Sequence, residues 1–404
     1  MRSMTKGLTL TVAAALAAVG PFAAAQSPAG SFGVGLGYVY PEIEFAVKRD
    51  TNIAMQPDVL RVADTISYVR PAFRFEARGG AQNYDAGYRG EYARYNRVTD
   101  YNYDDHEVFA GGDWTLGARN HFKLKGQYLD KVDPPGSLQI FTPTPTPSEY
   151  RQQILTGFYA YGAEEAAGKL ELQAGSYSKT YLNNRQPIGP QPGTEALDHS
   201  RTEFGASLLV RALPKTYATL TARQYHYDYT EAGSTKDSQE TYLLAGLRWN
   251  LSAVTSGRVG FGRQTKEFEL AGGGAGATKY SGGAWEGGLN WRPLFYSTFD
   301  FVTQKRTEEA TGIGDFVVNQ THQLAWTHVW GSRITTVVTA AYLKDSYSGT
   351  NRVDVTSTGG ARLFYAVRRW LKFGADYAGS MRASNDDNFD YRRNRFMLLA
   401  NFTL

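Results

Sequence analysis

The last ten residues of the chain, 395–404, carry an apolar side chain at every second position: Phe396, Leu398, Ala400, Phe402 and Leu404. Successive side chains of a strand point to opposite faces, so these five form one apolar stripe that continues to the final residue. Such a stripe is typical of the closing strand of an outer-membrane barrel, which presents one face to lipid. We therefore predict a closing strand here, with an assembly signal in the same five residues. The alternative is a buried terminal strand of a soluble sandwich.

Residues 1–25 have the features of a secretory signal peptide. Arg2 and Lys6 precede a short apolar segment, and three consecutive alanines end at Ala25. We expect a signal peptide at 1–25 and a single barrel domain at 26–404. Export through this cleavable signal would bring the protein to the outer membrane of a Gram-negative bacterium.

The composition excludes several other classes of protein. No cysteine occurs among the 404 residues, so disulfides, thiolate metal sites and covalently attached haem are excluded. Without the two bases of the signal peptide, 41 Lys and Arg face 39 Asp and Glu, whereas nucleic-acid binders normally have a basic excess. The mean hydropathy is −0.42 and no segment after residue 25 approaches 18 consecutive apolar residues, which excludes helical membrane spans. The 27 Tyr, 21 Phe and 43 Gly suit a transmembrane barrel with aromatic girdles and a polar interior.

Alternating apolar and polar positions predict about 18 strands of roughly ten to sixteen residues, most clearly at 243–251 and 371–377. The connections between them alternate between short turns and long polar loops. The short ones are 78–80, 118–120, 212–215, 250–253, 331–333 and 368–370; the long ones are 50–63, 96–104, 132–148, 183–200, 231–237, 270–279, 308–317 and 346–354.

Short periplasmic turns that alternate with long external loops are typical of outer-membrane barrels. The predicted fold class is therefore all-β: a closed antiparallel transmembrane β-barrel of about 18 strands. The predicted last strand, from about residue 390 to the end, should pair with a first strand near residues 33–49. Pro71 falls inside an otherwise regular strand, where we expect a bulge or a late strand start.

The six histidines form no catalytic or metal-binding pattern. None is followed two residues later by Ser, the pairing expected of a barrel phospholipase. His322 and His328 share one strand face but lie about 20 Å apart, too far to bind one metal ion. Asp104-Asp105-His106 and Asp198-His199 are only weakly similar to the acidic and Asp/His pairs of outer-membrane proteases. We expect no enzyme activity, no cofactor and no metal.

Charged residues on the strand face opposite the lipid-facing stripe indicate a hydrated lumen, because charges at membrane depth are costly unless they meet water or partners. The basic residues predicted to line this lumen are Arg70, Arg74, Arg78, Arg89, Lys123, Lys125, Arg223, Arg248, Arg258, Arg292, Arg306, Arg362 and Lys372. Acidic residues on the same face, such as Glu76, Glu286 and Asp376, are fewer. Two interpretations remain: ion-paired ladders that stiffen the wall, or a pore that attracts anions.

Three stretches resemble the putative β-barrel porin 2 family, whose members include outer-membrane barrels encoded with exopolysaccharide genes (EpsL type). The first is 115–124, which continues to Asp133-Pro134-Pro135-Gly136-Ser137. The second is 288–293, followed by 326–333, and the third runs from 365–371 to 391–396. The chain departs from the wider barrel pattern by ending in Leu404, where Phe or Trp is usual. The resemblance implies a role in exopolysaccharide export across the outer membrane and carries over no catalytic residues.

Two functions therefore stay open: a conduit for a secreted polysaccharide, or a general or substrate-specific diffusion porin for small hydrophilic solutes. A surface enzyme or adhesin built on the loops is a third. The expected partners are outer-membrane lipid and lipopolysaccharide, the barrel assembly machinery, and, for the first function, polysaccharide and periplasmic export components. Nucleic acid is not an expected partner.

Overall fold

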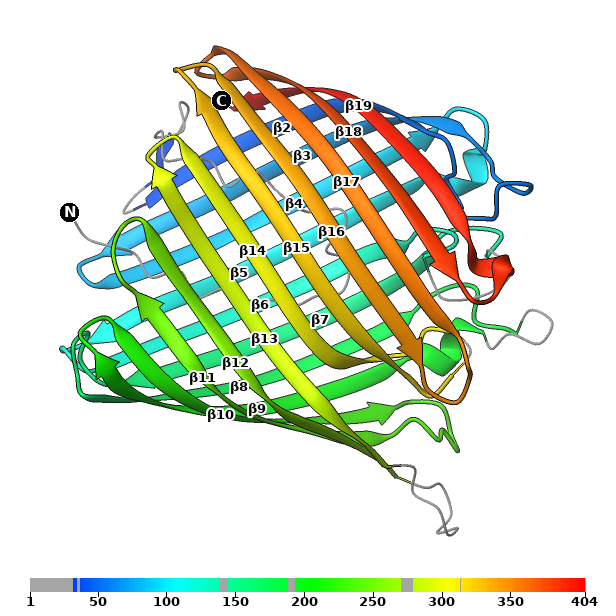
Figure 1. Ribbon diagram of the computed structural model, residues 1–404. Coiled ribbons are helices and arrows are strands. Elements are labelled where there is room, and N and C mark those ends of the chain that lie inside the picture. The colour runs from blue at the N-terminus through cyan, green and yellow to red at the C-terminus, as the bar shows by residue number, and fades with distance from the viewer. Residues whose placement is uncertain are drawn as a thin grey trace.

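The computed structural model describes residues 32–34, 37–137, 144–187, 193–269, 279–312 and 314–403. Within these ranges the chain forms one closed antiparallel barrel whose wall has eighteen strands, β2 to β19 (Figure 1). The predicted fold class is confirmed. The predicted signal peptide and Leu404, the last residue of the terminal stripe, lie outside the described residues.

The wall strands follow one another around the barrel in chain order. They are β2 (Gly37–Asp50), β3 (Asp64–Gly79), β4 (Gln82–Tyr95), β5 (Tyr103–Leu116), β6 (Asn120–Asp133), β7 (Ser148–Tyr161), β8 (Gly168–Tyr181), β9 (His199–Leu213), β10 (Thr216–Tyr229), β11 (Ser238–Asn250), β12 (Thr255–Phe268), β13 (Lys279–Leu294), β14 (Ser297–Glu309), β15 (Phe316–Trp330), β16 (Ile334–Tyr347), β17 (Val353–Arg368), β18 (Leu371–Ser384) and β19 (Tyr391–Thr403). A short strand, β1 (Phe32–Val34), pairs with the start of β2. Three single-turn helices, η1 (Thr99–Tyr101), η2 (Thr194–Leu197) and η3 (Asp387–Phe389), lie in the connections of the described part.

The strand that closes the barrel is β19. It pairs with β2 from Arg395 opposite Asp50 to Thr403 opposite Glu42, and with β18 on its other edge. The predicted closure by the last strand is therefore confirmed. Because every wall strand has a neighbour on both sides, the sheet has no terminal edge strand, which is how a barrel satisfies its backbone groups in lipid.

The two ends of the barrel differ in the length of their connections. One end has short turns such as 80–81, 214–215 and 369–370; the other has the long connections 51–63, 134–147, 182–198 and 230–237. Strand β2 begins and β19 ends at the short-turn end (Figure 1). In an outer-membrane barrel the short-turn end faces the periplasm, so the long loops face outward from the cell.

Strand β3 runs through Pro71 without a bulge. Its ladder with β4 skips residues 70 and 71 and resumes at Ala72 opposite Arg89 in an unchanged register. Gly90 lies across from Pro71 and leaves room for the ring, since even a methyl group there would come within 3.3 Å of the proline Cγ. The predicted bulge or late strand start is therefore wrong. The proline removes only one backbone N–H donor from the ladder, and the glycine opposite leaves space for its ring.

The outer face of the wall is an apolar belt. On β19, the outer-face residues Phe396 and Leu398 are 49% and 54% exposed, whereas Leu399, which points to the inner face, is 6% exposed. This alternation matches a wall with lipid on one side. No helix among the described residues is long and apolar enough to cross a membrane.

Deletion of residues 402–404 should prevent barrel assembly, because it removes the last rungs of the β19–β2 ladder. Phe402 also packs edge-on against Phe45 and stacks on Trp370, with ring centroids 6.0 and 6.2 Å away. Heat-modifiable migration on gels measures the folded barrel. Phe402→Tyr keeps the ring and the chain length and should migrate like the wild type. Normal heat modifiability of the truncated protein would contradict the assembly role of this segment.

Candidate functional site

The basic residues predicted to line the lumen lie on the inner face of the wall by strand alternation, and most of them are neutralised there. Nine of the thirteen form ion pairs with carboxylates of the same face: Arg70, Arg74, Arg78, Arg89, Lys123, Arg223, Arg248, Arg306 and Arg362. The Lys125 ammonium lies 5.8 Å from the ring of Phe109. Arg258, Arg292 and Lys372 form no ion pair with any residue that the structure describes. Whether these residues line a conducting path stays a prediction.

Two of the ion pairs join strands that are not neighbours. Arg223 on β10 makes a bidentate pair with Glu286 on β13, with N–O distances of 2.7 and 2.9 Å. Arg248 on β11 makes another with Glu171 on β8, at 2.6 and 2.9 Å. Each pair spans two intervening strands, so the wall is strongly curved at β8–β13. The interior there is crossed by charged side chains.

A second group of inner-face residues, which we call the polar corner, is buried near the long-loop end of β11–β14. Its members are Glu240, Gln264, Lys266, Thr307 and Glu309. The Lys266 ammonium lies between two carboxylates, 2.9 Å from Glu240 and 2.5 Å from Glu309, and its side chain is fully buried. On the adjoining connection 230–237, burial lowers the pKa of Lys236 below its usual value, against the opposing effect of Glu309 and Glu231.

Long connections fold over the interior at the same end of the barrel. In the β2–β3 connection, Ile53 packs into an inner-face cluster with Ile66, Tyr68 and Leu399. The β6–β7 connection reaches the same place: Gly136 has a φ of +78°, and a Cβ there would lie 1.8 Å from the carbonyl oxygen of Ala54. Two loops from separate hairpins therefore meet over the lumen and narrow its mouth.

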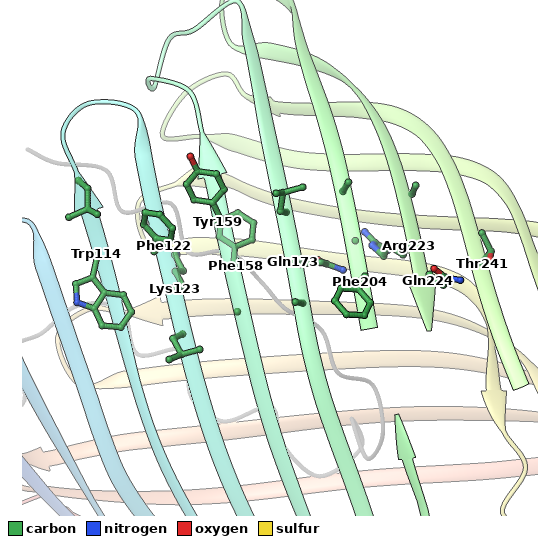
Figure 2. A pocket seen from close by; sticks show the side chains of 18 residues that line it. Trp114, Phe122, Lys123, Phe158, Tyr159, Gln173, Phe204, Arg223, Gln224 and Thr241 are labelled. Atoms are coloured by element: carbon green, nitrogen blue, oxygen red, sulfur yellow. The ribbon is translucent and has the colours of Figure 1, made fainter. Parts of the chain in front are cut away.

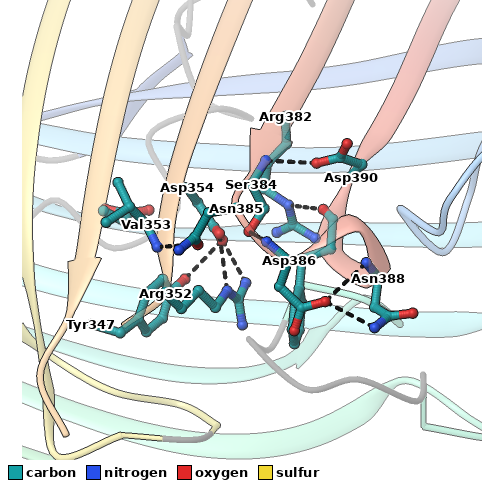
Figure 3. Close-up of polar contacts among 12 residues, drawn as sticks. Tyr347, Arg352, Val353, Asp354, Arg382, Ser384, Asn385, Asp386, Asn388 and Asp390 are labelled. Atoms are coloured by element: carbon teal, nitrogen blue, oxygen red, sulfur yellow. Dashed lines mark hydrogen bonds and ion pairs between the residues drawn. The ribbon is translucent and has the colours of Figure 1, made fainter. Parts of the chain in front are cut away.

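A third part of the mouth is held by polar contacts at the ends of β16–β19 (Figure 3). Arg352 donates from Nε and a terminal nitrogen to Asp354 at 2.9 and 2.5 Å, and Tyr347 donates to the same carboxylate. The Arg352 guanidinium also lies 3.2 Å from the ring centroid of Phe389 in η3. This one arginine therefore ties the η3 connection to the start of β17.

The inner face also carries a set of tyrosines stacked with cations that sequence reasoning missed. We call it the tyrosine–cation wall. Lys179 lies 3.8 Å from the ring of Tyr150 and 4.6 Å from that of Tyr181. Arg201 lies 4.9–5.8 Å from three further rings, and Lys266 lies 4.5 Å from one of them. The members of the wall are Lys179, Arg201, Lys266, Tyr150, Tyr177, Tyr181, Tyr225 and Tyr227. The missed signal is the alternation of Tyr and basic residues at every second position, as in 177–181.

A depression of about 1120 Å³ lies in the wall at β5–β11, toward the short-turn end (Figure 2). Its lining combines rings of the outer face, such as Trp114 and Phe204, with polar groups of the inner face, such as Lys123 and Arg223. Gly157 and Gly205 also line the depression, and neither has a side chain that could fill it. The depression is therefore a thin part of the wall rather than an enclosed ligand site.

The candidate catalytic pairs of the sequence are not assembled. His106 lies on the outer face, where its Nδ1 bonds the Tyr88 hydroxyl at 2.8 Å, whereas Asp105 is on the inner face and accepts from the Val132 N–H. Asp198 is engaged by Arg185 and by the backbone N–H of Tyr181. No group of three or more potential metal ligands occurs in the described ranges.

An eighteen-strand closed barrel with an apolar belt, a charged interior and long loops at one end defines the class of porin-like outer-membrane proteins. The sequence matches the family described as "Putative beta-barrel porin 2" over residues 20–403, and the chain belongs to that family. No curated protein sequence matches it.

Among solved structures, the barrel is similar to OccK2 (OpdF) of Pseudomonas aeruginosa, at 11% identity and a TM-score of 0.50, over 91% of this chain and 98% of that one. The same porin in complex with glucuronate gives 12% identity and a TM-score of 0.49 over the same shares. A bacterial polysaccharide outer-membrane secretin matches at 11% identity and a TM-score of 0.36, over 90% of this chain and 98% of that one. At these identities the likeness concerns the fold alone.

Replacing Arg223 by Met should lower the free energy of unfolding by about 2 kcal/mol, because the carboxylate of Glu286 would lose its bidentate partner. Arg74→Met is the matched control: its half-exposed ion pair with Glu76 should contribute less than about 0.5 kcal/mol. Urea unfolding of barrels folded into phospholipid vesicles measures both changes. Equal effects of the two substitutions would show that the pair between non-neighbouring strands does not brace the wall.

Proposed function

We propose that the protein is an outer-membrane channel for anionic carbohydrate that takes part in export of a secreted exopolysaccharide. The polymer would reach the short-turn end from periplasmic export components and leave through the long-loop end. Lipopolysaccharide and the barrel assembly machinery are its other proposed partners. A substrate-specific diffusion channel for small hydrophilic solutes is the second candidate.

The observation that carries the proposal is the tyrosine–cation wall. A tyrosine ring offers a flat apolar face with negative charge density, suited to the C–H face of a sugar ring, and its hydroxyl can bond sugar hydroxyls. The cations beside the rings have carboxylate partners in the protein, Asp133 for Lys179, Glu203 for Arg201 and two for Lys266, and would exchange them for the carboxylates of an acidic polysaccharide. Lys179, Arg201 and Lys266 lie on β8, β9 and β12, so the combination extends over several strands rather than forming one closed pocket. Its accessible part consists of the half-buried rings of Tyr150, Tyr177 and Tyr225, since Tyr181 and Tyr227 are buried. An extended surface of this kind suits a chain molecule.

Support for export specifically comes from the family resemblance. The narrowing of the mouth by the meeting of Ala54 and Gly136 favours a selective route over general permeability. The diffusion alternative is favoured by the charge balance of the wall, since nine predicted lumen bases are ion-paired and leave no strong field.

Loss of the gene should reduce extracellular polysaccharide while leaving uptake of small hydrophilic solutes almost unchanged. Polymer in the medium and the rate of entry of a small hydrophilic antibiotic are the two measurements. A plasmid copy of the gene should restore secretion. Normal secretion together with resistance to the antibiotic would replace the export function by the diffusion function.

Bases without a carboxylate partner should set the ion selectivity. Arg258→Ser and Arg292→Ser are expected to shift the reversal potential across a planar bilayer toward cations, since each removes a positive charge that is not held in an ion pair. The matched control is the double variant Arg362→Gln with Asp376→Asn, which removes an ion pair and leaves the net charge unchanged. The shift should shrink as salt rises, because the Debye length falls from about 10 Å at 0.1 M to about 3 Å at 1 M. A cation-selective wild-type pore, or equal shifts in the control, would contradict this assignment.

A further inference from the structure

The ladder between β13 and β14 is incomplete at the long-loop end. On its other edge β13 stays paired with β12 as far as Lys279 opposite Glu267. Its pairing with β14 stops at Trp285 opposite Lys305, although β14 continues to Glu309. In an unbroken register Gly283 would lie opposite Thr307. The stretches 279–284 and 306–309 are therefore two strand ends that have separated from each other.

The end of β14 has moved inside the barrel. Thr303, lower on this strand, is on the outer side, where it accepts from Trp285 Nε1 at 3.0 Å. Thr307 and Glu309 have the same parity as Thr303, yet they contact inner-face groups. The Thr307 hydroxyl donates to Glu240 on β11 at 2.9 Å, and Glu309 accepts from Lys266 on β12.

Two further contacts fix this overlap. The Thr307 N–H, which would serve the ladder with β13, donates instead to the side-chain oxygen of Gln264 at 3.0 Å. Phe316, the partner of Glu309 on β15, packs against Phe268 and Tyr280, with ring centroids 5.7 and 5.1 Å away. The ends of β14 and β15 thus lie behind β11–β13, on the lumen side.

The contacts of the polar corner hold this arrangement, but they carry a cost in desolvation and in unpaired polar groups. Lys266 and its two carboxylates are removed from water, and such desolvation offsets much of the attraction between the charges. The side-chain nitrogen of Gln264 and the hydroxyl of Ser238 are buried with no hydrogen-bond partner among the described residues. The alternative, a completed β13–β14 ladder, would regain backbone hydrogen bonds and return these groups to a wet lumen. Two arrangements of similar free energy are what a switch requires.

We propose that the ends of β14 and β15 form a gate with two positions: tucked against β11 and β12, which narrows the lumen, or paired with β13, which widens it. Both positions are defined by contacts within the protein, so the gate can be tested without any cargo. Strand β13 is suited to both positions, since residues 279–284 have no ladder partner on the edge that faces β14, whereas the opposite edge is paired with β12.

Because the chain has no cysteine, the paired position can be trapped by a designed disulfide. The test pair is Gly283→Cys with Thr307→Cys, which are opposite each other only when the ladder is complete. Facing residues of an antiparallel pair have Cα atoms about 4.5–5.5 Å apart, within disulfide range. The matched control is Gly287→Cys with Thr303→Cys, already opposite each other on the same two strands.

Purified barrels in vesicles are oxidised without any carbohydrate, and disulfide formation is followed by mass spectrometry. Single-channel conductance for KCl is then recorded before and after reduction. The control pair should oxidise readily and leave conductance unchanged. The test pair should oxidise slowly in the native background and at least about tenfold faster with Lys266→Met, which removes the shared cation of the tucked position. Its conductance should rise on oxidation and return on reduction.

Heat-modifiable migration confirms that each variant has folded before it is scored. Absence of the test disulfide in both backgrounds would overturn the proposal, since the β13–β14 seam would then be permanently open. A disulfide that forms without a change in conductance would also overturn it, because the moving ends would not control the lumen. Neither result depends on whether the protein exports polysaccharide.

Discussion

The structure depends on one constraint: where the wall meets lipid, its backbone N–H and C=O groups must find their partners within the sheet, and the incomplete ladder between β13 and β14 is open only at the long-loop end. The β19–β2 ladder satisfies this constraint for the chain ends, since without it two strands of 14 and 13 residues would present free edges to the membrane. Closure also fixes which side chains face inward. A shift by one residue at this seam would place Phe396 and Leu398 in the interior and Arg395 in lipid.

The interior must satisfy a second constraint, because closure of the barrel brings many charged side chains onto one enclosed face. Arg248 and Arg258 are direct cross-strand neighbours, an unfavourable pairing of like charges. The carboxylate of Glu171, reaching Arg248 from β8, reduces that repulsion. The pairs across intervening strands thus balance charge and also hold the strong curvature of the wall. The same pairing leaves few cations uncompensated, so attraction of anions depends on position rather than on overall charge.

The fold was largely predictable because three separate features of the sequence each indicated one part of it. Alternation located the strands, loop lengths oriented them, and the terminal stripe identified the closing strand. The error at Pro71 arose because the compensating Gly90 is distant in sequence and becomes its neighbour only in the sheet. The interior was less predictable. Period-2 reasoning assigns a face to Arg223 but cannot show that Glu286, three strands away, is its partner, because that contact depends on curvature. By the same alternation Thr307 would fall on the outer face, whereas in the structure it donates to Glu240 inside the barrel.

The proposed gate and the proposed binding surface share Lys266. Its ammonium lies between Glu240 and Glu309 in the tucked position, and also 4.5 Å from the Tyr227 ring. About four unmade ladder positions, at about 0.5–1.5 kcal/mol each, favour the paired position, and the contacts of Lys266 with its two carboxylates oppose it. A ligand shifts such an equilibrium only by its difference in affinity for the two positions. Tyr227 and Lys266 are buried in the tucked position, so a carboxylate sugar would reach them only after β14 has moved and would therefore bind the paired position better. Attraction of an anionic chain and opening of its path would then be one event.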